Sequence, residues 1–248
     1  MEFLCKKAER RLFVRNNGTN SLESVSKLEP IQIMDEIPAV EDMLTELQYF
    51  IPSNHSKERL MVIWKATIAY RNEQRANDNF LQFLRDFQAA SSFNGELLLE
   101  EFTILNPKAN DFISTWTVLQ PKLLSFFDEM YLHITNQFVR SLAILKNKNP
   151  TRGSRQVRDD ARKINPLHGI IVWIDPEVEI PACEFPQIFV AAEQFQCGDC
   201  FLVWDDFAIN TGRDLEHSFI LLCKSFTVFN VLPSSANKLF YAFLALSC

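Results

Sequence analysis

Apolar residues recur with helical spacing through the first half of the chain. One face between residues 57 and 71 repeats at intervals of three and four positions, and a second repeat lies between residues 80 and 87. These faces consist of Leu60, Ile63, Trp64, Thr67, Ile68 and Arg71, and of Phe80, Phe83, Leu84 and Phe87. The pattern predicts two helices that each turn one apolar face to the core, and it predicts that Trp64 is buried in that core.

Prolines mark the expected ends and starts of further helices. The sequence of residues 39–50 predicts a short helix that ends before Pro52. Pro107 and Pro121 are expected to open two more helices, because proline fits the first helical turn. The second of these helices would contain His133, which we interpret as a core or interface histidine rather than a catalytic base.

The second half of the chain contains apolar runs whose type the periodicity does not decide. The residues from 169 to 175 are β-branched, short and closed by Asp-Pro, which predicts a strand. Four longer runs lie at residues 185–195, 199–209, 215–229 and 236–246. Their length favours helices, with Trp204 in the core, although each could also be a buried strand. The predicted fold class is therefore mainly α, a single helical domain with a short β element near residues 169–175; an α+β fold is the alternative.

Composition supports one large core and two flanking polar segments. The 248 residues are 47% hydrophobic, so the chain can bury a core without a disulfide or metal. Residues 1–34 form a basic N-terminal segment and a linker rich in Asn, Ser and Gly, and residues 35–248 form the helical globular domain. Residues 146–163 are expected to be an exposed basic loop within that domain.

Glycine and cysteine usage exclude several chemistries and favour one compartment. The six glycines are too few and too scattered for a phosphate-binding loop or a dinucleotide fingerprint, and they leave tight hairpins little to work with. No cofactor is predicted. Scattered cysteines, without a signal peptide or a long apolar span, indicate a soluble cytoplasmic or nuclear protein with reduced thiols.

The spacing of Cys197 and Cys200 suggests a thiol-redox or metal centre, with nearby carboxylates as further ligands. The carboxylates in question are Asp175, Asp199, Asp205 and Asp206. However, zinc needs four ligands, and no second paired spacing follows. Adjacent carboxylates on a helix also point about 100° apart. The preferred interpretation is therefore a pair of small thiols that bind no zinc, with the redox or metal-dependent enzyme as the alternative.

Charge is segregated along the sequence, and this segregation indicates a binding role. Basic residues dominate between residues 140 and 163, whereas acidic residues dominate between residues 164 and 222. We expect a partner protein, acidic in character, to contact Arg152, Arg155, Arg158, Arg162 and Lys163. The net charge of −6 and the lack of aromatic residues in this stretch argue against nucleic acid. The sequence does not indicate an oligomeric state.

Two segments resemble a known helical family. The stretches "RLMVIWKATIA", residues 59–69, and "FLVWDDFAINTG", residues 201–212, resemble landmark segments of the TBC domain, which activates the GTPase activity of Rab proteins. The resemblance implies an all-helical fold and binding to small GTPases. Counterparts of that family's arginine-finger and glutamine-finger motifs are absent, so it does not imply catalysis. The sequence as a whole predicts an adaptor or complex subunit without catalytic activity.

Overall fold

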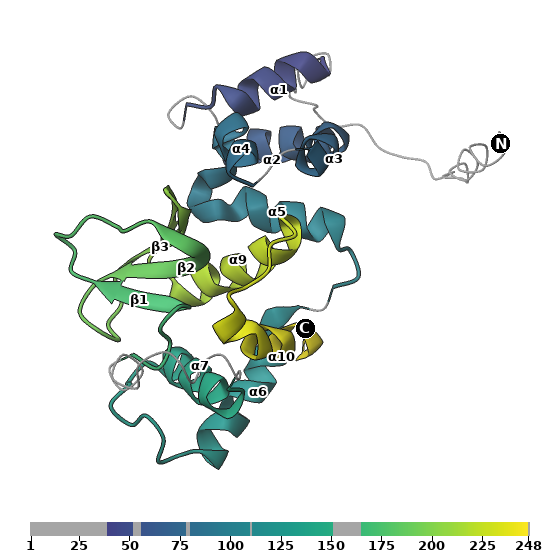
Figure 1. The fold of residues 1–248 in the computed structure, drawn as a ribbon. Helices are drawn as coiled ribbons and strands as arrows, with labels where there is room; N and C mark the ends of the chain where they lie inside the picture. The colour runs from purple at the N-terminus through teal and green to yellow at the C-terminus, as the bar shows by residue number, and fades with distance from the viewer. Residues whose placement is uncertain (1–38, 52–55, 78–79, 110, 151–164, 248) are drawn as a thin grey trace, which may run out of the picture. The chain divides into compact units, whose positions relative to one another are not determined.

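The computed structural model describes residues 39–51, 56–77, 80–109, 111–150 and 165–247, and within these residues helices accompany a four-stranded sheet (Figure 1). The helices are α1 Val40–Gln48, α2 Lys57–Ala66, α3 Ile68–Asn77, α4 Phe80–Asp86, α5 Glu96–Leu105, α6 Phe112–Phe126, α7 Gln137–Lys148, α9 Leu215–Val228 and α10 Lys238–Ser247. Short 3₁₀ turns are η1 Gln88–Ser91, η2 Phe93–Gly95 and η4 Ser235–Asn237. The strands are β1 Ile171–Ile174, β2 Cys183–Ala191, β3 Asp199–Asp205 and β4 Phe207–Gly212. The fold is therefore mainly α with a small β element, as predicted.

The sheet has the order β1-β2-β3-β4 and mixes two pairing directions. β1 runs parallel to β2, with Ile171 opposite Ile188, whereas β2, β3 and β4 are antiparallel neighbours. The strand predicted near residues 169–175 is confirmed as β1. Because a parallel pair needs a long return connection, the ladder with β1 begins only at Ile188, well after the chain leaves β1.

Two of the four predicted C-terminal helices are wrong, because residues 185–195 and 199–209 contribute strands. Neighbouring residues such as Leu202 and Val203 are both buried, so these strands lack the alternation of a half-exposed sheet. The other two runs, residues 215–229 and 236–246, are helical as predicted and form α9 and α10.

The β3–β4 hairpin turns without glycine, contrary to the expectation that tight hairpins would be disfavoured. Trp204 pairs with Phe207, which leaves Asp205 and Asp206 as the two loop residues. Asp205 has a φ of 56°, a conformation that aspartate tolerates better than most residues. The acidic pair therefore has a structural role in the turn.

The resemblance to the helical TBC domain does not extend through both of its segments. Residues 59–69 lie in α2 and α3, in agreement with a helical family. Residues 201–212 instead form the β3–β4 hairpin, so the all-helical fold implied for them is wrong.

Neither Pro107 nor Pro121 opens a helix, which corrects the prediction for the middle of the chain. Pro107 lies in the turn after α5, and Pro121 lies inside α6. α6 begins instead at the cap residue Asp111, whose carboxylate accepts the backbone N–H groups of Ile113 and Ser114. His133 lies exposed in the turn before α7, so its prediction as a core histidine is also wrong.

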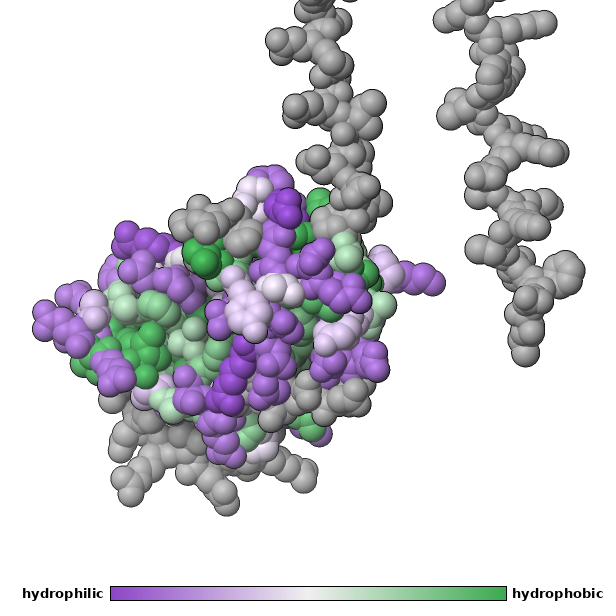
Figure 2. All heavy atoms as spheres, turned by 90° about the horizontal axis from the view of Figure 1, so that it is seen from above, coloured by the Kyte–Doolittle hydropathy of each residue, from purple (hydrophilic) through white to green (hydrophobic). Residues whose placement is uncertain are grey.

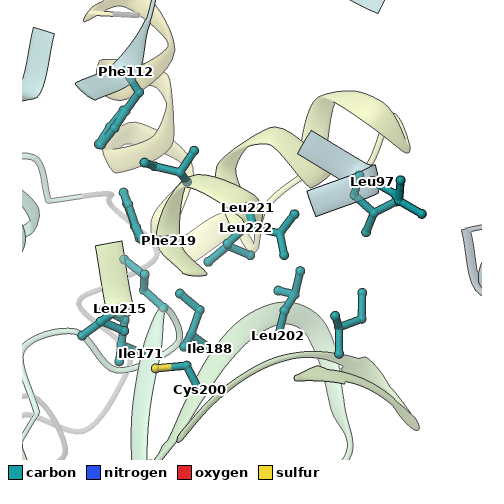
Figure 3. Close-up of a cluster of buried hydrophobic side chains, with 14 of the residues drawn as sticks. Leu97, Phe112, Ile171, Ile188, Cys200, Leu202, Leu215, Phe219, Leu221 and Leu222 are labelled. Carbon is teal, nitrogen blue, oxygen red and sulfur yellow. The ribbon is translucent and has the colours of Figure 1, made fainter. Parts of the chain in front are cut away.

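Helix α9 is the centre of the core (Figure 3). Leu215 and Leu222 of α9 face the sheet residues Ile171, Ile188, Cys200 and Leu202, while Leu97 and Phe112 lie on the other side of the helix. Phe219 is fully buried and its ring lies 6.0 Å from that of Phe112. One helix thus joins the sheet to α5 and α6.

The helical face predicted between residues 57 and 71 is confirmed, and it includes a buried charge. Arg71 and Glu101 of α5 are both fully buried and form a 2.5 Å ion pair. Arg71 also donates to the Trp64 carbonyl and to Thr67 Oγ1, and Arg75 donates to Glu101 at 2.6 Å. Burial lowers the pKa of Arg71, and the Glu101 carboxylate opposes that shift. This cluster ties α2 and α3 to α5.

Candidate functional site

The structure separates the two thiols of the predicted redox or metal centre. Cys197 is exposed in the β2–β3 connection, whereas Cys200 is buried in β3. Burial is the main cause that raises the pKa of Cys200 to about 11, and a hydrogen bond with Ser218 only partly offsets it. Cys200 is therefore a protonated core residue at neutral pH, unlike the reactive thiolate of a redox centre.

We expect thiol labelling to distinguish the two cysteines. In the folded protein at pH 8, Cys197 should react with a disulfide reagent, whereas only about one Cys200 thiol in a thousand would be ionised at a pKa near 11. The measurement is the rate of the fast labelling phase in the wild type and in the Cys197→Ser and Cys200→Ser variants. Loss of a fast-reacting thiol in Cys200→Ser would contradict the assignment.

The carboxylates near the cysteines do not converge on one point. Asp206 lies 3.7 Å from Arg85 and Asp199 lies 3.5 Å from Arg213, so each faces a cation. Within the described residues, no group of three or more histidine, cysteine or acidic side chains is arranged to hold a metal ion. The absence of zinc at Cys197 and Cys200 stays a prediction, which elemental analysis of untagged protein would test.

The basic residues predicted to contact a partner lie outside the described residues. This applies to Arg152, Arg155, Arg158, Arg162 and Lys163. The beginning of the predicted loop is described: Lys146 and Lys148 lie in α7, and the Lys146 ammonium donates to the His168 carbonyl.

An apolar groove, which the sequence did not reveal, lies among α5, α6, α9 and α10. The face over α1–α4 is mostly hydrophilic (Figure 2), whereas the groove is lined from other elements. Its lining residues are Phe102, Asn106, Ala109, Phe112, Ile220, Cys223, Lys224, Phe226, Thr227, Leu232, Pro233, Lys238, Tyr241, Ala242 and Leu244. We call this site the α9–α10 groove. Its volume of about 580 Å³ is in the range of natural ligand sites.

The aromatic residues that line the groove pack against buried rings of the core. The ring centre of Phe226 lies 4.8 Å from that of Tyr241, which in turn lies 5.2 Å from that of Phe240. Phe240 lies 6.2 Å from the core residue Phe219. Leu232 lines the groove with 79% of its surface exposed. The groove is therefore a preformed apolar surface with an exposed rim.

Few polar groups line the groove, and they have distinct environments. The Lys224 ammonium lies 5.0 Å from the centre of the Phe102 ring, and Lys238 is exposed. The Asn106 amide donates to the Phe102 carbonyl. Tyr241 is nine-tenths buried and its hydroxyl has no hydrogen-bond partner among the described residues; burial raises its pKa well above the ordinary value.

A larger hollow lies beside β1, but its lining is chemically mixed. It measures about 810 Å³ and includes His168, Trp173, Asp175 and Glu193. Ligand sites typically combine a mainly apolar wall with a few placed polar groups. The α9–α10 groove fits that description better, so we take it as the candidate site.

The sequence held one signal for this groove. Lys224 interrupts the apolar run of residues 215–229, and Lys238 interrupts that of residues 236–246. A lysine inside such a run is consistent with a polar group placed at an otherwise apolar site. The lining comes from four helices and the turns that flank them, and only the structure shows that these segments meet.

No family model, curated protein or solved structure matches this chain. Among the helices of the described residues, none combines the length and apolar character that a membrane crossing requires.

Proposed function

We propose that the protein is a binding or adaptor subunit without catalytic activity, and that the α9–α10 groove holds an apolar segment of another protein. The observation that carries the proposal is the groove itself, about 580 Å³ in volume and walled mainly by apolar and aromatic side chains. Exposed apolar surface of this kind marks interaction sites in soluble proteins.

The environment of the cysteine and aspartate candidates supports a role without catalysis. The Cys200 thiol has a raised pKa, and Asp205 and Asp206 form a hairpin turn. A nucleophile or general base needs a pKa matched to its task, and the surroundings of Cys200 shift it the opposite way.

We expect the groove substitution Leu232→Ser to abolish most partner binding without unfolding the protein. Leu232 is 79% exposed, so its loss removes contact area from a bound segment but little from the core. Leu132→Ser is the matched control, because Leu132 is 66% exposed and does not line the groove. The measurement is the affinity for peptides selected on the wild-type protein from a random display library.

The two variants, Leu232→Ser and Leu132→Ser, should differ in peptide affinity. Binding should fall about ten-fold or more in Leu232→Ser, which corresponds to roughly 1.4 kcal/mol, and should be retained in Leu132→Ser. Equal peptide affinity in the two variants would show that the groove is not the binding site. Thermal melting of both variants checks that the fold is intact.

The basic stretch supplies a second contact in the same proposal. Reversing Arg152, Arg155 and Arg158 to Glu should weaken binding to an acidic partner and reduce its sensitivity to salt, with little change in melting temperature. The measurement is partner affinity at low and high ionic strength. Unaltered affinity in the triple variant would leave this stretch as a connector only.

A further inference from the structure

Two lysines, Lys224 and Lys238, are among the residues that line the α9–α10 groove. Lys224 belongs to α9 and Lys238 to α10, and neither forms a salt bridge with a described residue. The carboxylate that acts on Lys224 is Asp111. Asp111 already accepts hydrogen bonds from the Ile113 and Ser114 backbone and from the Ser114 hydroxyl. The two lysines therefore remain available to a bound anion.

The two lysines lie in different environments on their helices. Lys238 opens α10 directly after η4, and a cation near the N-terminal end of a helix opposes the helix dipole. Lys224 is half-buried over the Phe102 ring, where it is partly removed from water. A carboxylate that enters the groove would therefore gain more from Lys224 than from a fully solvated lysine.

The walls of the groove favour a helical occupant. Its lining residues lie on α5, α6, α9 and α10 and in the turns that flank them, and none lies on a strand. An extended segment would find no strand edge and would place unpaired N–H and C=O groups against apolar walls. A helix satisfies its own backbone and presents only side chains to the groove.

We propose that the α9–α10 groove binds an amphipathic helix of another protein, with a carboxylate side chain of that helix paired to Lys224 and Lys238. This inference rests on the proposed function, because it names the occupant of the same groove. The apolar face of the helix covers Phe226 and Leu232, and its carboxylate pairs with the two lysines of the lining.

The test is a selection from a display library of helical peptides in which surface positions are randomised. Peptides enriched on the wild-type protein should combine an apolar face with Asp or Glu at one position. Their affinity should fall about ten-fold or more in Lys224→Gln/Lys238→Gln, as expected when a charge-assisted hydrogen bond is lost. Lys122→Gln is the matched control, because Lys122 lies on α6 outside the groove lining.

Each other outcome overturns a specific statement. Selected peptides that need Leu232 but show no acidic preference would overturn the carboxylate pairing and leave the proposed function intact. Selected peptides that are insensitive to Leu232→Ser would overturn the proposed function as well. Lysine-dependent binding of dodecanoate, with no peptide enriched, would replace the protein helix with a lipid carboxylate.

Discussion

Glu101→Ala is expected to lower the free energy of unfolding by about 3–5 kcal/mol, the largest electrostatic effect in the described part of the protein. The substitution leaves Arg71 fully buried without its carboxylate and removes a hydrogen bond from Arg75. The pair itself need not stabilise the fold more than apolar residues would, but its disruption is costly because the remaining charge cannot reach water. Denaturant unfolding measures the change.

The neighbouring Glu100→Ala is the control. Glu100 pairs with Lys65 at 2.9 Å near the surface, where such a pair contributes at most about 1 kcal/mol. Similar losses in the two variants would show that Glu101 is not the partner of a buried charge.

Trp64→Ala should cost about 3–5 kcal/mol, because the indole is fully buried and packs edge-on against Phe83 and Phe87. The guanidinium carbon of Arg71 also lies 3.8 Å from the ring centre of Trp64, so a cavity at this position would disturb the ion pair of Arg71 with Glu101. The melting temperature and the free energy of unfolding check this result.

Trp204→Ala serves as the comparison, and it corrects the expectation that both tryptophans are core residues. Trp204 lies in β3, is only partly buried, and donates its indole N–H to the Glu184 carbonyl. We expect a smaller loss than for Trp64→Ala. An equal loss would mean that burial does not determine the cost at these two positions.

Local periodicity was sufficient to predict a helix and its buried residues where the helix has one buried face. Residues 57–71 show a three-to-four spacing, and the structure buries Leu60, Ile63, Trp64 and Arg71. The strands escaped prediction because β2 and β3 bury consecutive residues, so their sequences show no alternation. The turn at Asp205 was not predicted for a different reason. Asp205 adopts a positive φ, a backbone conformation that was expected only of glycine.

The candidate site could not be predicted because it arises from tertiary packing. Cys197 and Cys200 were selected by their spacing, yet the β3 backbone places one thiol outside and one inside. The groove combines Phe102 of α5 with residues of α9 and α10 that lie far away in the sequence.

The central position of α9 has a consequence for hydrogen exchange. The same helix packs on the sheet through Leu222 and contributes Lys224 to the groove, so a partly unfolded form without α9 would lose both the sheet contact and the groove at once. A ligand that binds only the folded state raises the free energy of this opening reaction, by about 2.7 kcal/mol when the ligand concentration is a hundred times its Kd. Slowly exchanging amides of α9 and of β2 and β3 should therefore gain protection together, although the strands never touch the ligand.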